Sequence, residues 1–403
     1  WRPPNWGRMR VYVDPTRGTL YVATGAPVSV VKNTVDLVRI DPDTGAARVV
    51  KGPMGGTDMT FGPEGHAFFR TLNHVVRFEP TKSGDWREVP FDYGEERGVS
   101  GHKAISAVSF PGGGQGASSM YSDAQYGGIA VSPLGEVAVA SPYALRQKRA
   151  GGDQKGPQRY QPRIYPGRGG DTVVSVFDKH GKPIELDAVQ GIALVDGIRM
   201  DRDKNLYVQV LGQPAVNGKR PPNANLTACT LIKAKVGDLR ILSHRGVVPL
   251  SKGRKPDRPP DFLMNNGSPV WVEGAQWMYG DVGLSGRSVP VSNCHCQSNA
   301  RFDLDYYARS FASEVVKYRV VVLDSNGNVI TRIGKYGNVD EGMPLIKKGI
   351  PNPRAIGGDE VALMNCLQLA VHTDKRLFLS DIGNYCVRSV KLGYHAEARV
   401  AVE

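Results

Sequence analysis

The chain lacks the features that mark most membrane proteins and several large enzyme classes. None of its apolar runs approaches the ~20 residues that cross a bilayer as a helix, and no long stretch keeps a helical period of apolar residues. The Gly-x-Ser-x-Gly elbow of serine hydrolases and a phosphate-binding glycine loop are both absent. Cys-x-x-Cys-His is absent too, which excludes the usual covalent attachment of a c-type haem.

Turn-forming residues are abundant instead, with 48 glycines and 28 prolines among 403 residues. Residues 367–391, LQLAVHTDKRLFLSDIGNYCVRSVK, show how such turns separate short apolar strands. Three short apolar runs are separated by Asp, Asn and Gly turns, which predicts a three-stranded antiparallel meander. A single meander cannot bury both of its faces, so we expect it to recur along the chain.

Six copies of this meander can be traced. The middle strand of each is a largely apolar triplet after a polar turn, centred on Tyr21, Phe68, Val137, Tyr207, Phe311 and Phe378. Each triplet follows a strand that ends in a turn, such as VYVDPTRG, and precedes another apolar strand, such as DLVRIDPDTG. Room remains for a fourth, outer strand, as at 46–50 and 329–331. Repeated four-stranded meanders predict an all-β fold, a single β-propeller domain.

We expect six blades, with seven as the alternative. The six span roughly residues 9–52, 53–100, 120–190, 191–245, 298–334 and 360–403. The alternative arises because the step from Tyr207 to Phe311 is much longer than the others, so that 269–272 and 275–279 could be strands of a degenerate extra blade. Closure is expected to pair residues 396–402 with 9–13, which would remove the open sheet edges.

The motifs SDIGNYCVRSVKL, VVVLDSNGNVITRIGKYGN and LAVHTDKRLFLSD resemble NHL-type repeats. The resemblance is closest over residues 300–393 and places the chain beside the gluconolactonase-like β-propellers. It departs from the family pattern at Cys386, where a polar or basic residue is more common, and at His372, which stands for the usual Asp. It implies the propeller fold and says little about function.

Some propellers of this kind are metal-dependent lactonases or amidating lyases, with ligands at the axial ends of the innermost strands. The residues that the resemblance implies for such an axial polar site, with oxygens suited to calcium, are Asn265, Asn266, Asn299 and Asn365, together with Asp58, Asp196 and Tyr126. The alternative is that these side chains cap turns. A lyase would need three convergent histidines. Candidates are His102, His295 and His372, but their neighbours do not match the family pattern.

The five cysteines are expected on one face of the propeller, the face that carries the connections between blades. Each lies near the start of a first or third strand of a blade, and these strands run parallel. They are Cys229, Cys294, Cys296, Cys366 and Cys386.

Three interpretations of the cysteines stay open. Disulfides could join Cys366 to Cys386, and Cys229 to Cys294 or Cys296. The first pair would require Cys366 to bend out of its strand, because the two strands lie about 9–10 Å apart. A copper or zinc site could instead form on Cys294, His295 and Cys296. The third interpretation is ordinary buried cysteine.

The net charge of +12 is scattered, with basic clusters at 146–149 and 252–255. These clusters either keep loops solvated or contact an acidic partner, a polysaccharide or a neighbouring subunit. No basic stripe interleaved with aromatic residues occurs, so nucleic acid is not an expected partner.

Four long insertions, 91–126, 144–170, 212–226 and 253–300, are candidate carriers of function. Aromatic residues in such loops are expected to be exposed, among them Tyr121, Tyr126, Trp271 and Trp277. A candidate protein interface comprises Tyr160, Tyr165, Tyr306 and Tyr307. For the last two, the alternative is that they cover the edge of a blade.

These features predict an exported, non-catalytic propeller that binds a protein partner or assembles with itself through its loops. The first residue is Trp1, which fits a removed export signal and a periplasmic or extracellular location, although a truncated chain would begin the same way. The alternative is a metal-dependent propeller enzyme, or a redox-associated protein, with copper, zinc or calcium bound on the Cys-rich face.

Overall fold

The computed structural model describes residues 9–24, 36–53, 58–70, 75–91, 105, 128–143, 171–192, 195–222, 228–243, 256–263, 267–283, 301–337, 346–347, 350–351, 361–372, 375–384 and 386–393. Within these ranges the chain is all β, apart from one 3-10 turn, η2 (Val315–Lys317). The described residues include no helix that could span a membrane.

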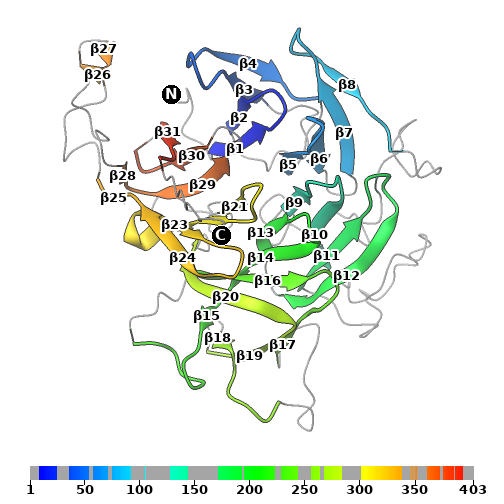
Figure 1. Cartoon of the computed structure of the whole chain (residues 1–403), viewed down its shortest axis with the longest axis vertical. Helices are drawn as coiled ribbons and strands as arrows, with labels where there is room; N and C mark the ends of the chain where they lie inside the picture. The colour runs from blue at the N-terminus through cyan, green and yellow to red at the C-terminus, as the bar shows by residue number, and fades with distance from the viewer. Residues whose placement is uncertain are drawn as a thin grey trace, which may run out of the picture.

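The sheets stand around a common axis, as in a β-propeller (Figure 1). Four of them have four antiparallel strands in chain order, from the axis outward. The first comprises β1 (Met9–Asp14), β2 (Thr19–Thr24), β3 (Asp36–Ile40) and β4 (Ala47–Lys51), and the second β5 (Asp58–Phe61), β6 (Ala67–Arg70), β7 (Val75–Pro80) and β8 (Trp86–Glu88). The fourth comprises β13 (Val195–Met200), β14 (Asn205–Leu211), β16 (Cys229–Lys235) and β20 (Ala275–Val282), and the fifth β21 (Asp303–Leu304), β22 (Ser310–Glu314), β23 (Arg319–Leu323) and β24 (Val329–Ile333).

The sixth sheet shows three antiparallel strands, β29 (Cys366–Val371), β30 (Arg376–Asp381) and β31 (Cys386–Lys391). Two short two-stranded sheets precede it in the chain. Strand β25 (Lys335–Tyr336) pairs with β28 (Ala362–Leu363), and β26 (Ile346–Lys347) pairs with β27 (Ile350–Pro351).

The third sheet is larger and mixed. It begins with β9 (Gly128–Val131), β10 (Val137–Tyr143), β11 (Asp171–Phe177) and β12 (Pro183–Ile192), and continues outward through β17 (Leu239–Ser243), β19 (Pro269–Glu273), β18 (Phe262–Leu263) and β15 (Gln213–Pro214). Strand β17 pairs with β12 in parallel. The four outer strands therefore come from two insertions of the fourth sheet that add to the edge of the third. The first holds β15, between β14 and β16, and the second holds β17 to β19, between β16 and β20.

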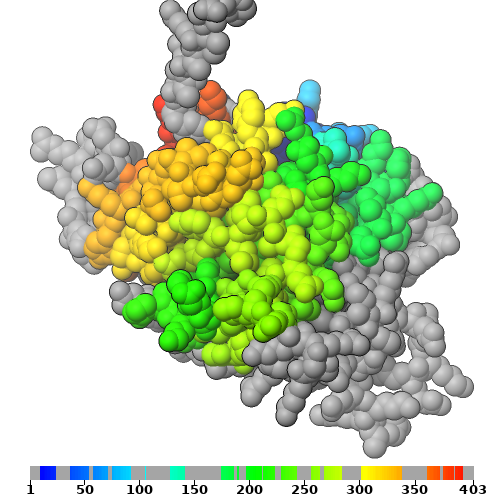
Figure 2. All heavy atoms as spheres, turned by 60° about the horizontal axis from the view of Figure 1, so that its bottom comes forward, coloured from blue at the N-terminus to red at the C-terminus, as the bar shows by residue number. Residues whose placement is uncertain are grey.

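The polypeptide returns from this insertion to the fourth sheet at Gly274. Its φ is +79°, and a Cβ atom there would lie 2.2 Å from the carbonyl oxygen of Asp238, so only glycine fits. Strand β20 then runs along the outer edge, where the indole nitrogen of Trp277 donates to the carbonyl of Ser325 at 3.0 Å. Figure 2 shows this yellow-green segment beside the orange strands of the fifth sheet.

Apolar packing closes the ring. Each pair of neighbouring sheets shares one buried cluster, from the first and second sheets to the fifth and sixth. A further cluster joins the first sheet to the last, where Val11 and Val22 pack with Ala370 and Phe378. The predicted terminal strand, 396–402, lies outside the described residues, so the contact between the first and last sheets rests here on side chains.

The structure confirms the propeller arrangement, as five antiparallel blades and one larger mixed sheet. All six predicted triplets lie in the second strand of a sheet, in β2, β6, β10, β14, β22 and β30. The suggested extra blade is wrong, because 269–272 belongs to β19 of the third sheet and 275–279 to β20 of the fourth. The insertion 253–300 is accordingly not a plain loop, and Trp271 is fully buried rather than exposed.

Candidate functional site

A cavity of about 510 Å³ lies on the axis, where the six innermost strands end. Its lining comes from all six sheets, at 11–13, 15, 60–63, 131–133, 199–202, 303–307, 309, 370–372 and 375, with Leu392 in addition. The turns that follow these strands hold the lining in place. In three of them the first residue is Asp, and its carboxylate accepts the backbone N–H two residues on, at Thr16, Asp203 and Tyr307. A propeller axis is where several blades can place side chains around one small molecule.

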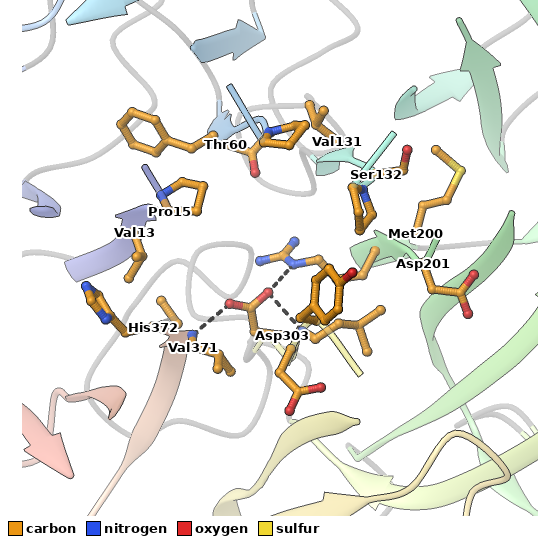
Figure 3. Close-up of a pocket in the computed structure, with 18 of the residues that line it drawn as sticks. Val13, Pro15, Thr60, Val131, Ser132, Met200, Asp201, Asp303, Val371 and His372 are labelled. Carbon is orange, nitrogen blue, oxygen red and sulfur yellow. Dashed lines mark hydrogen bonds and ion pairs between the residues drawn. The ribbon is translucent and has the colours of Figure 1, made fainter. Parts of the chain in front are cut away.

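Two charged side chains of opposite sign meet at this cavity. Asp303, from β21, accepts a hydrogen bond from Arg199 Nε of β13 at 2.6 Å through Oδ1, and one from the backbone N–H of Val371 in β29 at 2.9 Å through Oδ2. Figure 3 shows Asp303 in the middle of the lining, between His372 and Asp201. The side chains of Arg199 and Asp303 remain 20% and 17% exposed, so both can be reached from the cavity. These contacts together link the fourth, fifth and sixth sheets. The pair itself presents both donors and acceptors without net charge.

His372 lines the same cavity and replaces the Asp of other turns. Its Nε2 lies 3.0 Å from the carbonyl oxygen of Gly18, in the turn of the first sheet. A carbonyl oxygen only accepts, so Nε2 donates the proton of this bond. The departure from the repeat pattern at His372 therefore joins the last sheet to the first and places an imidazole at the cavity.

The rim of the cavity carries two exposed aromatic rings. Tyr306 and Tyr307 are 64% and 67% exposed, as predicted for a contact surface, and their rings meet edge to face with centroids 5.6 Å apart. The guanidinium of Arg202 lies over the ring of Tyr306 at 5.2 Å, and that of Arg309 lies over Tyr307 at 5.3 Å. Tyr160 and Tyr165, the other half of the predicted interface, lie outside the described residues.

At the opposite end of the same inner strands, a buried ionic cluster crosses the axis. Asp58 begins β5 of the second sheet and accepts from Arg301, just before β21 of the fifth sheet, at 2.6 Å. Arg10 donates to Asp58 at 3.2 Å and the Tyr12 hydroxyl at 3.0 Å. Burial of Asp58 works to raise its pKa, but the guanidinium of Arg301, followed by that of Arg10, outweighs burial and lowers the pKa.

This cluster bears on the predicted axial metal site. Two guanidinium groups already neutralise Asp58 and would repel a cation, so this residue does not fit a metal ligand. Asn365 fits better: its amide oxygen is buried and accepts no hydrogen bond from the described residues. Asn265, Asn266, Asn299 and Tyr126 lie outside the described ranges, as do His102 and His295. Among the residues that the structure describes, no three His, Cys, Asp or Glu side chains are grouped to hold a metal.

The cysteines that can be placed agree with the predicted face but not with the predicted bridge. Cys366 begins β29, Cys386 begins β31 and Cys229 begins β16, so all three lie at the strand ends away from the cavity, and all are buried. Cys366 and Cys386 both face Asp381 of β30, which separates them, and no disulfide joins them. Burial, reinforced by Asp381, raises the pKa of the Cys366 thiol. The proposed metal ligands Cys294, His295 and Cys296 lie outside the described residues.

The pair Arg199–Asp303 was not among the predicted site residues, although the sequence holds a signal for it. In five of the six repeats the residue two places before the inner turn lines the cavity, as Tyr12, Thr60, Arg199, Asp303 and Ala370 show. Charges of opposite sign occupy this position in two successive repeats. The predictions had concentrated on the starts of the inner strands, whereas the cavity lies at their ends.

Comparison with known proteins finds solved structures of low sequence identity. No description of a known protein family matches the sequence, and neither does any curated protein. Similar solved structures include a gluconolactonase from Xanthomonas campestris, at 12% identity over 94% of this chain and 83% of that one, with a TM-score of 0.39. Virginiamycin B lyase from Staphylococcus aureus matches at 11% identity over 97% and 98% of the two chains, with a TM-score of 0.39. Regucalcin, a calcium-binding protein from Agrobacterium tumefaciens, matches at 12% identity over 94% and 82%, with a TM-score of 0.40.

Proposed function

We propose that this protein is a propeller enzyme that binds a small, uncharged polar molecule in the axial cavity and carries out acid–base chemistry on it. The observation that carries the proposal is the Arg199–Asp303 pair, reachable from a cavity at which six sheets converge. A matched ion pair offers donors and acceptors but no net charge, so it favours a neutral ligand rich in hydroxyl or carbonyl groups.

His372 is the proposed acid–base group. Its imidazole lines the cavity together with the pair, and imidazole is the side chain best suited to proton transfer near neutral pH. We assign Arg199 and Asp303 to ligand binding and His372 to proton transfer in a hydrolysis or an elimination.

This proposal replaces the scaffold role expected from the sequence. The long loops that were to grip a partner, at 92–104, 106–127 and 144–170, lie outside the described residues, whereas the cavity supports the enzyme alternative. Arg199, Asp303 and His372 lie at the end of the inner strands that is opposite to Cys366 and Cys386. We therefore assign the site to the face of the inner turns and not to the predicted Cys-rich face. A protein partner and a location outside the cytoplasm remain predictions, which co-purification and cell fractionation would test.

The first experiment is ligand-observed NMR with neutral polyols, lactones and esters against the wild type and Arg199→Met. The matched control is Arg240→Met on the outer strand β17, which removes the exposed ion pair between Arg240 and Glu273. We expect binding to be lost in Arg199→Met and kept in Arg240→Met. Unchanged binding in Arg199→Met would overturn the proposed site.

The catalytic assignment needs its own test. Any neutral ligand found by NMR is followed for turnover with His372→Gln, whose amide can still donate to Gly18 but cannot transfer protons. We expect the variant to bind the ligand with turnover reduced by a factor of 10² or more. Full turnover in this variant would remove His372 from the mechanism, and binding without turnover in the wild type would favour a binding protein.

We also propose that the mixed sheet supplies the sixth blade. Strands β9 to β12 follow one another from the axis outward, as the strands of the other sheets do, and their apolar clusters face both neighbours. The outer four strands are then an addition to that blade. A crystal structure that includes residues 394–403 would test this count, and a further blade between the last sheet and the first would contradict it.

A further inference from the structure

The turn that carries Tyr306 and Tyr307 is held in one conformation by hydrogen bonds to Asp305. Asp305 accepts the backbone N–H groups of Tyr307 and Arg309, each at 2.9 Å, and also pairs with the guanidinium of Arg309. Ala308 holds the left-handed backbone conformation, with φ at +58°. The two rings are therefore held in place before any ligand arrives.

The surroundings of the rings limit what they can bind. Arg202 and Arg309 each lie over one tyrosine ring, and Arg202 also donates to the Tyr306 hydroxyl at 3.3 Å. Two guanidinium groups beside the rings would repel a ligand cation. Both residues are nevertheless more than half exposed, and small polar residues would satisfy the turn equally well. The exposed aromatic surface is thus not explained by folding.

We propose that Tyr306 and Tyr307 form an aromatic platform that binds a flat aromatic group of the ligand whose polar part occupies the axial cavity. This inference rests on the proposed function and deepens it, because it assigns the substrate class: neutral polar molecules that carry an aromatic substituent. Both tyrosines line the cavity together with Arg199 and Asp303, so one ligand can contact both. Aromatic rings prefer offset or edge-to-face partners, and the perpendicular pair offers both a face and an edge.

The test uses three neutral probes that share one polar part: methyl, cyclohexyl and phenyl β-glucoside. Their dissociation constants are measured by NMR titration with the wild type, with the double variant Tyr306→Ala/Tyr307→Ala, and with the double variant Tyr306→Phe/Tyr307→Phe. We expect the wild type to prefer the phenyl probe. The alanine variant should bind that probe roughly three- to tenfold more weakly, with the methyl probe unchanged, and the phenylalanine variant should behave like the wild type.

The outcomes separate the platform from the pocket. If the alanine variant leaves the affinity for the phenyl probe unchanged, the platform is wrong, even where Arg199→Met still abolishes binding of the methyl probe. If cyclohexyl and phenyl probes bind equally well, the surface is merely apolar and the aromatic assignment is overturned. If none of the three probes binds to the wild type, the platform and the neutral-ligand pocket both fail.

Discussion

Two aspartate–arginine pairs lie at opposite ends of the same inner strands, and they differ in their further hydrogen-bond partners and in their access to solvent. Asp58 and Arg301 are 0% and 6% exposed and join the second and fifth sheets across the axis. Asp303 and Arg199 are 17% and 20% exposed and line a cavity. Buried ionic groups that satisfy one another hold a structure in register, whereas groups that keep contact with a cavity can exchange partners with a ligand.

The chemistry of a side chain therefore does not identify the site in this fold, because both ends of the axis carry the same pair. The end at which the strands start is closed by Arg10, Arg301 and Tyr12 around one carboxylate. The end at which they finish opens into the cavity. The comparison assigns stability to the first end and ligand binding to the second.

The largest expected effect is on stability at the closed end. Asp58→Asn leaves two guanidinium groups buried without their carboxylate, which should lower the free energy of unfolding by about 3–5 kcal/mol. Urea denaturation measures the change. Asp303→Asn is the control at the open end, where we expect a loss of roughly 1 kcal/mol because the pair is partly solvated. Equal losses of stability at the two ends would contradict the assignment of stability to the closed end.

For ligand binding, the larger effect is expected at the open end. Arg199→Met and Asp303→Asn should each weaken binding of a neutral ligand at least about tenfold, since each leaves the partner charge unpaired at the cavity. Isothermal titration calorimetry measures the affinity. A variant at the closed end, Arg10→Met, removes the contact with Asp58 at a residue that does not line the cavity, and it should leave the affinity nearly unchanged. A comparable loss in Arg10→Met would mean that the two ends act as one site.

Part of the pH dependence of stability should come from the closed end. The pKa of Asp58 is lowered in the folded protein, so its contribution is present above the ordinary aspartate value of about 3.9 and is lost as the pH falls through the lower folded value. Unfolding measured between pH 2 and 6 should show the free energy falling toward acid pH. In Asp58→Asn this fall should be shallower, and an identical slope would contradict the assignment.

The smallest effect concerns the contact between the last sheet and the first. His372→Ala removes the hydrogen bond to the Gly18 carbonyl and should lower the free energy of unfolding by about 1 kcal/mol. Thermal denaturation detects a change of this size. His372→Gln, which can still donate, should recover most of the stability. A loss that Gln does not recover would assign the stabilisation to ring packing on Phe378 instead.

Much of the fold could be predicted because it follows from local patterns. The apolar triplets and their Asp-containing turns specify hairpins one at a time, and all six lie where the sequence places them. The addition of β17 to β12 could not be predicted, because a parallel pairing between different repeats leaves no periodic trace in either strand. For the same reason Trp271, in that insertion, was expected to be exposed, yet it is part of a sheet.

The site was only partly predictable. The exposure of Tyr306 and Tyr307 followed from large rings in a tight polar turn. Arg199 and Asp303 were missed because their pairing depends on how the fourth sheet packs against the fifth, which brings side chains 104 residues apart in sequence within 2.6 Å. The starts and ends of the inner strands carry similar polar residues, and only the packed structure tells which end is sealed.

The addition of β17 to the edge of the third sheet has a consequence for folding during synthesis. Strand β12 ends at Ile192, but its outer neighbour β17 begins only at Leu239. During synthesis the edge of β12 therefore stays uncovered until some fifty further residues have left the ribosome. An uncovered strand edge is a template for pairing with other chains. This is the interval in which the nascent chain is most exposed to aggregation and in which a chaperone would have its natural target.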